Sequence, residues 1–315
     1  MKVLVVGGAG YIGGGVTDIL KERGISFTVY DNLLYEDLFL KPVDFIFGDV
    51  RDTEKLKKLL KEHTHVIWLA AIVGDAACQI KPDLTNAVNE DAVKWLADNF
   101  DGRIVFASTC SVYGQNDDEL DEESSLNPLS LYAQTKMQAE DYLKDKNAMI
   151  FRLGTVYGMS DTYSRLRMDL VVNYMTARAH NFGKLSVFGG AQWRPLIHVM
   201  NVAEAIVNAL DTEHTGIYNL STSNYTMKEL GQEIADLTGC DVEFVEQKVE
   251  DQRNYRVKND KAKASGLLEF KPVLRVEDGV RQIYNAIKSG RVRYVDSDIY
   301  SNERHIANLE KNGQL

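Results

Sequence analysis

The sequence predicts an α/β protein in which a mostly parallel sheet is covered by helices on both faces. Short apolar runs alternate with helical patterns through the first half of the chain, which is typical of parallel strands joined by crossover helices. The chain has 315 residues, of which 44% are hydrophobic and 26% charged. This composition allows a large buried core in one or two domains.

The elements of the first half follow from these runs in order. The first run, "KVLVV", has four apolar residues before Gly7. It is too short for a signal-peptide core or a membrane span, so we expect a cytoplasmic protein. The expected strands lie at 2–6, 26–30, 43–47, 65–70, 103–108 and 148–153. The expected helices lie at 11–23, 53–61 (capped by Thr53), 85–99 and 131–145.

After Gly158 the pattern changes to longer helical stretches and short strands, which predicts a smaller, mixed α/β region. The polar tail from residue 290 is expected to pack on the outside, and the acidic run 117–123 to form a solvated loop. The predicted domains are therefore 1–158 and 159–315, with a segment near 190–212 returning to the first. The expected helices of this half lie at about 163–181, 201–211, 226–238 and 275–288, and the expected strands at "GIYNL" and "VEFVE".

Charge and cysteine content exclude several classes of partner. The net charge of −10 argues against a nucleic-acid surface and against binding to an anionic membrane. Three cysteines, Cys78, Cys110 and Cys240, have no paired spacing, which indicates neither a disulfide framework nor a zinc site. The scattered histidines have no acidic or cysteine ligands around them, so no metal is expected.

A glycine-rich turn joins the first strand to the first helix. In "VVGGAGYIGGG" the glycines Gly7, Gly10 and Gly13 would let the backbone approach a pyrophosphate at the helix N-terminus. Such turns also occur for conformational reasons, but this position favours a dinucleotide site. Asp31, which ends the second strand, could accept a hydrogen bond from a ribose hydroxyl and would repel a 2′-phosphate, which predicts NAD rather than NADP. Asp49, after the third strand, either reaches the adenine edge or caps its own loop.

From residue 3 to about 280, the chain resembles the extended short-chain dehydrogenase/reductases that act on nucleotide sugars, such as UDP-glucose 4-epimerases. The motifs that carry the resemblance are "GGAGYIG", "YDN", "GDVRD", "WLAA", "FASTCSVYG", "YAQTK", "FRLGTVYG", "RPLIHVMNVAEAI" and "RNYRV". It implies a Rossmann domain that binds NAD, a C-terminal region for the nucleotide sugar, and a homodimer formed through the helices at 85–99 and 131–145. The implied cofactor contacts are Gly7, Gly10, Tyr11, Ile12, Gly13, Asp31, Asn32, Asp49, Val50, Leu69, Ala70, Ala71, Asn89, Ser108, Tyr132 and Lys136.

The stretch "LYAQTK" supplies the implied catalytic pair. In the family that this chain resembles, the tyrosine (here Tyr132) is the general base and the lysine (here Lys136) orients the cofactor ribose. A spacing of four places both on one helical face, and a nearby positive charge lowers a tyrosine pKa of about 10 by roughly 1–3 units. An isolated pair of this kind would be an ordinary surface pair. The resemblance adds Thr109, which would bond the reacting sugar hydroxyl, with Ser108 nearer the nicotinamide.

Departures from the family pattern narrow the reaction. Related 4,6-dehydratases carry Asp-Glu after the threonine, where this chain has Cys110 and Ser111, so elimination of water is disfavoured. The histidine that GDP-fucose epimerase-reductases carry after "VYG" has no counterpart in "VYGMSDTYSR", where Met159 replaces the usual proline. No neighbour in sequence would activate Cys110 as a nucleophile, so we interpret it as a buried structural residue.

The substrate end is implied by the same resemblance. Arg194 and Arg253, with Arg256 as an alternative to the latter, fall on positions that contact the substrate diphosphate, a role that suits the guanidinium fork. A surface salt bridge is the competing interpretation for Arg253 and Arg256, and Trp193 packs either near the base or into the core. The segment "RLRMDLVVN" replaces the usual asparagine-leucine pattern and gives a looser likeness to dehydrogenases of GDP-heptoses. The implied substrate contacts are Thr109, Thr155, Asp169, Leu170, Arg194 and Arg253.

We therefore predict NAD-dependent oxidation at C4 of a nucleotide sugar through a 4-keto intermediate. The motifs for oxidation are shared by a 4-epimerase, which is the main prediction, and by a net 4-dehydrogenase, which is the alternative. A non-catalytic NAD or nucleotide-sugar sensor is a third hypothesis. The presence of Thr109, Tyr132 and Lys136 favours an enzyme over a sensor.

Overall fold

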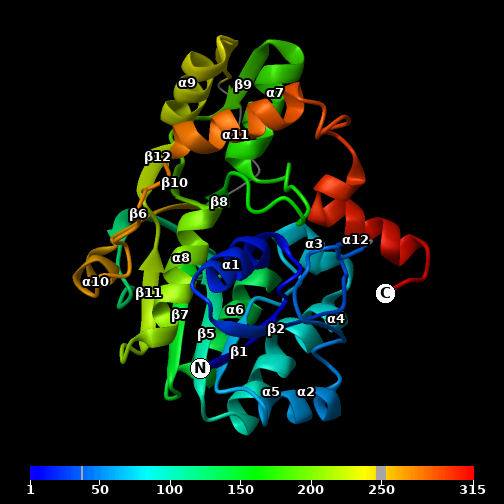
Figure 1. The fold of residues 1–315 in the computed structure, drawn as a ribbon. Coiled ribbons are helices and arrows are strands. Elements are labelled where there is room, and N and C mark those ends of the chain that lie inside the picture. Colours follow the sequence, from blue (N-terminus) through cyan, green and yellow to red (C-terminus); the bar gives the residue numbers. More distant parts are fainter. Residues whose placement is uncertain (37, 246–252) are drawn as a thin grey trace.

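A seven-stranded parallel sheet forms the centre of the computed structural model, which describes residues 1–36, 38–245 and 253–315 (Figure 1). Its strand order is β11-β7-β5-β4-β1-β2-β3, and each neighbouring pair is parallel. These strands are β1 (Lys2–Val6), β2 (Ser26–Asp31), β3 (Phe45–Phe47), β4 (His65–Trp68), β5 (Arg103–Thr109), β7 (Ala148–Leu153) and β11 (Gly216–Leu220). The predicted fold class is confirmed.

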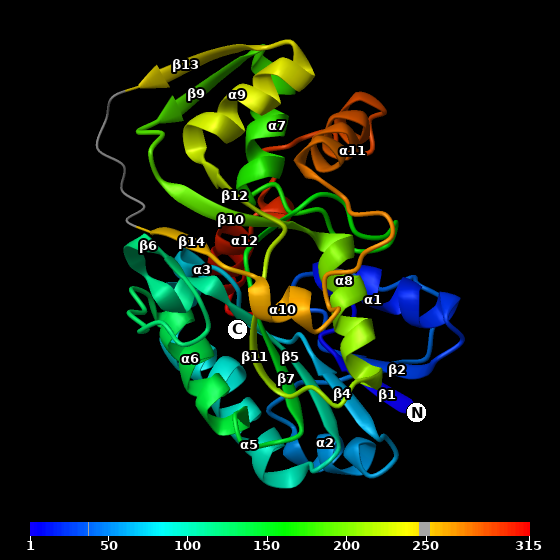
Figure 2. The ribbon, with the colours of Figure 1, turned by 90° about the vertical axis from the view of Figure 1, so that its left-hand side faces the viewer.

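The central strands are apolar throughout because both of their faces are covered. In β1, Val3 and Val5 join the core beneath α1 and α8, whereas Leu4 and Val6 join the core on the opposite face. Figure 2 shows α1 and α8 on one side of the sheet and α5 and α6 on the other. The helices of these two layers are α1 (Tyr11–Glu22) and α8 (Val199–Asn208) on the first side, and α2 (Thr53–Leu60), α3 (Asp75–Ile80), α4 (Pro82–Asn86), α5 (Ala92–Asn99) and α6 (Leu131–Leu143) on the second.

A second lobe packs above the carboxyl ends of these strands. Its helices are α7 (Val171–Phe182), α9 (Met227–Thr238) and α11 (Val276–Lys288), and α7 and α11 pack against each other. Its strands are β8 (Thr155–Tyr157), β10 (Trp193–His198) and β12 (Ser223–Thr226) in one sheet, and β9 (Lys184–Phe188) and β13 (Asp241–Val245) in another. "GIYNL" is β11 and extends the large sheet instead of belonging to this lobe. "VEFVE" coincides with β13 up to Val245, and residue 246 lies outside the described residues.

At two of the element boundaries that differ from the prediction, side chains compete for backbone groups. Asp52, not Thr53, caps α2, and its carboxylate accepts a hydrogen bond from the Lys55 N–H. The helix predicted from 163 begins only at Val171. Before it, the Asp161 carboxylate accepts hydrogen bonds from the backbone N–H groups of Tyr163 and Ser164, which holds this segment as a turn.

The acidic run and the tail also differ from expectation. Residues 115–120 form strand β6 (Gln115–Leu120), which pairs with β14 (Asn254–Val257) while its charged side chains face water. Much of the expected acidic loop is therefore a strand. The tail does more than cover the outside, because it contains α12 (Asn302–Lys311), whose Ile306 is 1% exposed in the main core. α12 lies beside α3 (Figure 1). The remaining helices are α10 (Asp260–Ala264), a π-helical turn (Ala87–Asp91) and short 3-10 turns at Cys110–Tyr113, Ala209–Asp211 and Asp298–Tyr300.

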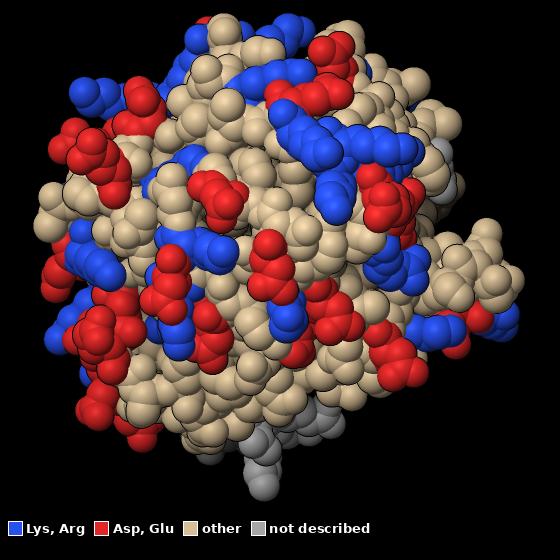
Figure 3. All heavy atoms as spheres, turned by 90° about the horizontal axis from the view of Figure 1, so that it is seen from below, with Lys and Arg blue, Asp and Glu red and all other residues tan. Residues whose placement is uncertain are grey.

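Three further features concern the surface charge, membrane-spanning helices and clusters of metal ligands. Acidic and basic side chains are interspersed over the face of the molecule seen from below in Figure 3. Among the described residues, no helix is long and apolar enough to cross a membrane. In the same residues, no three His, Cys, Asp or Glu side chains gather as a set that could hold a metal ion.

One buried lysine joins the two lobes. Lys41 Nζ lies 2.7 Å from a carboxylate oxygen of Asp161, at the start of the second lobe, and 2.7 Å from one of Asp18 on α1. It also donates to the Gly14 carbonyl oxygen at 2.8 Å. The side chains of Lys41 and Asp161 are 2% and 1% exposed, so removing Lys41 would leave the Asp161 carboxylate without its countercharge and away from water.

We therefore expect Lys41→Ala to lower the free energy of unfolding by about 3–5 kcal/mol. The measurement is urea unfolding followed by circular dichroism. The matched control is Lys94→Ala, because the Lys94–Asp98 pair is exposed and its removal should leave the free energy of unfolding nearly unchanged. Equal losses in the two variants would contradict a special role for the buried cluster.

Candidate active site

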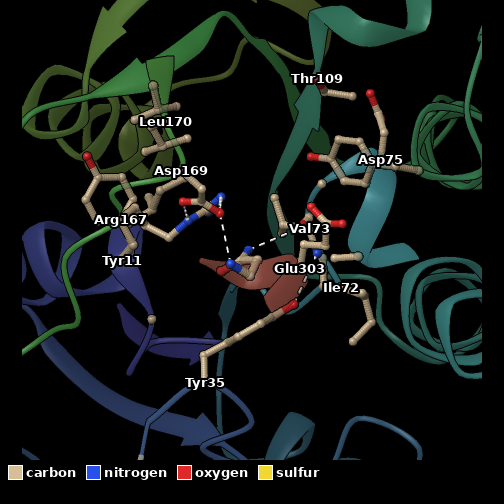
Figure 4. A pocket seen from close by; sticks show the side chains of 18 of the residues that line it. Tyr11, Tyr35, Ile72, Val73, Asp75, Thr109, Arg167, Asp169, Leu170 and Glu303 are labelled. Atoms are coloured by element: carbon tan, nitrogen blue, oxygen red, sulfur yellow. Dashed lines mark hydrogen bonds and ion pairs between the residues drawn. The ribbon is translucent and has the colours of Figure 1, made fainter. Parts of the chain in front are cut away.

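A cavity of about 1480 Å³ lies between the two lobes, at the carboxyl ends of β1, β2, β4 and β5. Ligands of open parallel sheets bind at this edge, because the loops that follow the strands converge there. Figure 4 shows part of its lining, which includes residues from both lobes and from α12.

The glycine turn forms the floor of the cavity. Gly7 has a φ of +82°, and a Cβ on it would lie 2.4 Å from the Ala70 nitrogen. A Cβ on Gly13 would lie 2.4 Å from the Gly8 oxygen, so both glycines are required by close packing. Gly10 is different, because its Cβ would meet only the Gly7 oxygen at 3.4 Å. It begins α1 without a side-chain cap, which leaves backbone N–H groups facing open space, as a dinucleotide phosphate requires.

Two carboxylates stand at the adenosine end predicted from the sequence. Asp31 accepts hydrogen bonds from the N–H groups of Ala9 and Leu33, at 3.0 and 2.8 Å, and burial raises its pKa. Asp49 caps its own loop by accepting the Arg51 N–H at 2.9 Å and also lines the cavity, so its contact with the adenine edge stays a prediction. Burial acts to raise the pKa of Asp49, but hydrogen bonds from Arg51 outweigh this and hold the pKa below its usual value.

Most of the other predicted cofactor residues also line the cavity, and Asn89 does not. Its amide oxygen accepts from the Ile72 N–H at 2.8 Å and its nitrogen donates to the Ile72 oxygen at 2.9 Å. Asn89 is 1% exposed, so it acts on the cavity by holding the loop that contains Ile72. The predicted residues in the lining are Gly7, Gly10, Tyr11, Ile12, Gly13, Asp31, Asn32, Asp49, Val50, Leu69, Ala70, Ala71, Ser108, Tyr132 and Lys136.

The tyrosine and lysine of α6 line the cavity together with Thr109. Ser130 caps α6 by accepting the Ala133 N–H, which starts the helix so that Tyr132 and Lys136 face the end of β5. Lys136 Nζ donates to the Ala107 carbonyl oxygen at 2.8 Å, and burial lowers its pKa to about 8. Burial raises the pKa of Tyr132, while a hydrogen bond with Thr109 acts in the opposite direction.

A buried ion pair supports these side chains from below. Glu140, one helical turn after Lys136, pairs with Arg152 of β7 at 2.7 Å, and both side chains are 3% exposed. The Ser108 hydroxyl donates to the same Glu140 carboxylate. The pair therefore fixes α6 against β5 and β7. The hydroxyl hydrogen of Ser108 is bonded to Glu140 and so does not face the cavity.

The residues that follow Thr109 carry no acid pair. Cys110 is fully buried, its thiol donates to the Arg152 carbonyl oxygen, and burial raises its pKa. The Ser111 hydroxyl lies 3.1 Å from the Thr109 hydroxyl and 3.3 Å from that of Tyr255 on β14. Tyr255 lines the cavity and escaped the sequence analysis, although it stands between the two arginines of "RNYR".

At the substrate end the structure separates the competing arginines. Arg194 and Arg253 line the cavity, and the Arg194 guanidinium donates to the backbone oxygens of Trp193 and Arg253. Arg253 also forms an ion pair with Asp75 at 3.4 Å. Arg256 instead stacks on the Trp193 ring at 5.2 Å, and neither of these two residues belongs to the lining.

Three further predicted substrate residues, Thr155, Asp169 and Leu170, line the cavity from the second lobe. Asp169 is committed to other partners, because its carboxylate pairs with Arg167 at 2.7 Å and accepts the Asn302 N–H at 2.9 Å. Arg167 and Asn302 also line the cavity. Sequence reasoning missed both residues, because the polar tail offered no pattern and Arg167 lies in a segment predicted as helix.

Residues 3–221 match the NAD dependent epimerase/dehydratase family. The chain belongs to this family. It is accordingly an NAD-dependent enzyme of the extended short-chain dehydrogenase/reductase type, as predicted.

Similarity to individual proteins extends over both lobes. The UDP-glucose 4-epimerase of Rhizobium meliloti is 29% identical over 301 residues, which cover 83% of this chain and 90% of the relative. The solved UDP-glucose 4-epimerase of Thermus thermophilus, in complex with NAD, is 27% identical with a TM-score of 0.76, and the match covers 91% of this chain and 99% of that one. MoeE5, solved with UDP-glucose and NAD, is 25% identical with a TM-score of 0.77, and the match covers 92% and 100%.

The cysteines give a test of the site geometry. We expect iodoacetamide at pH 8 to modify the folded protein at Cys240, which is partly exposed, and to spare Cys78 and Cys110, whose buried thiols stay protonated. Mass spectrometry should find one adduct per folded chain and three after denaturation. Rapid labelling of Cys110 would show instead that the turn after Thr109 holds an accessible thiolate.

Proposed function

We propose that the protein is a nucleotide-sugar 4-epimerase in which Tyr132 removes the proton of the C4 hydroxyl. NAD, when bound, accepts a hydride from the sugar carbon and can return it. The observation that carries the proposal is the meeting of Tyr132, Lys136 and Thr109 in one cavity whose floor is the glycine turn. The similarity to UDP-glucose 4-epimerases supports it.

Lys136 makes the phenol of Tyr132 usable as a base. Burial stabilises the neutral forms of both groups, since it raises the pKa of Tyr132 and lowers that of Lys136 to about 8. A protonated lysine beside the phenol favours the phenolate and lowers its pKa. Thr109 orients the sugar hydroxyl toward this base, and Lys136 also orients the cofactor ribose.

The other predicted residues divide between cofactor and substrate. Asp31, with Asn32, holds the adenosine ribose, and the start of α1 holds the cofactor phosphates. Arg194 and Arg253 bind the substrate diphosphate, for which their lining of the cavity and fixed backbone contacts are the support. Asp169 has lost this role in our proposal, because its charge would repel the diphosphate and is already used by Arg167.

Net 4-dehydrogenation remains the second candidate, since oxidation needs the same residues. Elimination of water is disfavoured, because the buried thiol of Cys110 and the hydroxyl of Ser111 replace the acid pair of the related dehydratases.

The organisation of the enzyme is also part of the proposal. Residues 1–158, with a returning segment near 190–212, form the NAD domain, and 159–315 mainly form the substrate region of a cytoplasmic enzyme of carbohydrate biosynthesis. The inferred homodimer rests on the family resemblance. Val93 and Leu96, on the helices expected to form it, lie in the core of their own chain, so the dimer would use outer residues such as Trp95 and Tyr142.

Product analysis tests the reaction. We expect incubation with NAD and a panel of UDP-, GDP-, dTDP- and CDP-sugars to give, for one of them, a product of unchanged mass and altered retention. Liquid chromatography with mass spectrometry measures both properties. Loss of two hydrogens would mean net oxidation, and loss of water would contradict our interpretation of Cys110 and Ser111.

Substitutions on α6 test the mechanism. Tyr132→Phe should lower kcat by roughly 10²–10⁴-fold, because it removes the general base. Lys136→Met should shift the acid limb of the pH profile of kcat to higher pH, because the Tyr132 pKa rises once the cation is lost. Lys144→Ala, at the exposed end of the same helix, is the control and should leave the profile unchanged. Full turnover by Tyr132→Phe would refute the mechanism.

A further inference from the structure

The C-terminal segment, residues 301–315, forms one wall of the cavity. It lies outside the residues that match the family, and α12 is anchored in the main core through Ile306. In Figure 4 Glu303 of this segment lies beside Ile72 and Val73. The residues of this segment in the lining are Ser301, Asn302, Glu303, Leu309, Gln314 and Leu315.

α12 is attached to the two loops that flank the glycine turn. The Asn302 amide donates to the Val73 carbonyl oxygen at 3.0 Å, in the loop after β4. His305 Nε2 lies 2.8 Å from the Leu34 carbonyl oxygen, in the loop after β2. β2 and β4 are the neighbours of β1 in the sheet. A dinucleotide bound at the glycine turn runs across these three strand ends, so α12 spans the same path.

The third attachment of α12 is the Asp169 carboxylate. It accepts the N–H of Asn302, the first residue of the helix, where a negative charge is stabilised by the free N–H groups. One side of the Asp169 carboxylate is therefore held by α12 and the other by Arg167. Arg165 donates to the Asn302 side chain and stacks on the Tyr35 ring at 5.0 Å. The loop 165–170 and α12 therefore form one unit.

Arg167 faces the start of α1 from this unit. Its side chain is 11% exposed, it lines the cavity, and it lies beside Tyr11 in Figure 4. Asp169 pairs with Arg167, and Glu36 accepts the Arg165 N–H, so both arginines of this wall have a carboxylate beside them. A guanidinium opposite the N-terminus of α1 suits an anionic ligand that bridges the two.

We propose that residues 301–315 complete the cofactor site, covering the bound dinucleotide and holding it through turnover, with Arg167 facing its phosphates and the Asp169–Asn302 contact keeping the cover closed. The inference rests on the proposed function, because it requires NAD to bind in the cavity beside the glycine turn. It also deepens that function. An epimerase must return the hydride to the same sugar, so its reduced cofactor has to stay in place, whereas a net dehydrogenase must exchange it with solution. A cover anchored at three points favours the epimerase.

Dissociation of the cofactor tests the cover directly. The rates at which NAD and NADH leave the protein are measured by stopped-flow fluorescence with excess competing nucleotide, without any sugar present. Asn302→Ala and Asp169→Asn should each raise these rates roughly tenfold, because the first removes the bond to the Val73 oxygen and the second removes the negative charge that holds Arg167 and the N-terminus of α12. Asn308→Ala is the matched control, since Asn308 is an exposed residue of the same helix that bonds Asp298, and it should leave the rates unchanged. Rates in Asn302→Ala and Asp169→Asn that match the unsubstituted protein would overturn the proposal.

Hydrogen exchange on the unsubstituted protein gives a second test that does not depend on the folding of a variant. Addition of NAD should slow amide exchange in residues 302–311 and in the loop 165–170. Slowing confined to the glycine turn and the neighbouring strand ends would overturn the cover while leaving the proposed function intact. A protein that does not bind NAD would overturn both.

Discussion

The close approach of backbone at the first crossover is the constraint on which the rest of the structure depends. Gly13 packs against the Gly8 carbonyl and Gly7 against Ala70, at distances that exclude a side chain. α1 can therefore begin directly at the end of β1 and point its N-terminus into the cavity. The next two glycines extend the same effect: a Cβ on Gly14 would strike the Asp161 carboxylate, and one on Gly15 the Met200 sulfur. The glycine run thus serves the packing of both lobes around α1 as well as the phosphate site.

Buried ion pairs position the segments that surround the cavity above the glycine turn. Lys41 joins α1 to the start of the second lobe, and the Glu140–Arg152 pair locks the helix that carries Tyr132 and Lys136 to the sheet. Desolvating these groups costs free energy that their mutual attraction must offset. Their effect here is positional: each pair holds two segments that are distant in sequence, and Lys136 is left with a carbonyl oxygen, a phenylalanine ring and the cavity around it. That environment makes the state of its proton responsive to what the cavity contains.

Prediction from the sequence succeeded where a sequence motif and the structure that it determines lie within one strand–turn–helix unit. The first strand, the glycine turn and the pair on α6 are such cases, because a spacing of four on a helix or three glycines after a strand have direct geometric meaning. It failed where a distant partner changed the local outcome. Asp161 turned an apparent helix into a loop, and residues 117–120 of the acidic run became a strand because β14 supplied the pairing edge.

The sequence by itself determined the fold class, and it predicted that the glycine turn, Tyr132 and Lys136 line one cavity, since each of these motifs rests on residues close together in the chain. Tertiary structure decided which polar residues complete the cavity. Asn302 lies 133 residues from Asp169 and 229 from Val73, and Tyr255 lies 144 from Ser111. No periodicity or spacing relates positions so far apart. Their contacts arise only after the sheet and the second lobe have packed. For that reason the folded chain, and not the sequence pattern, indicates the role of the tail and the pairing of Asp169. The same holds for the choice between Arg253 and Arg256.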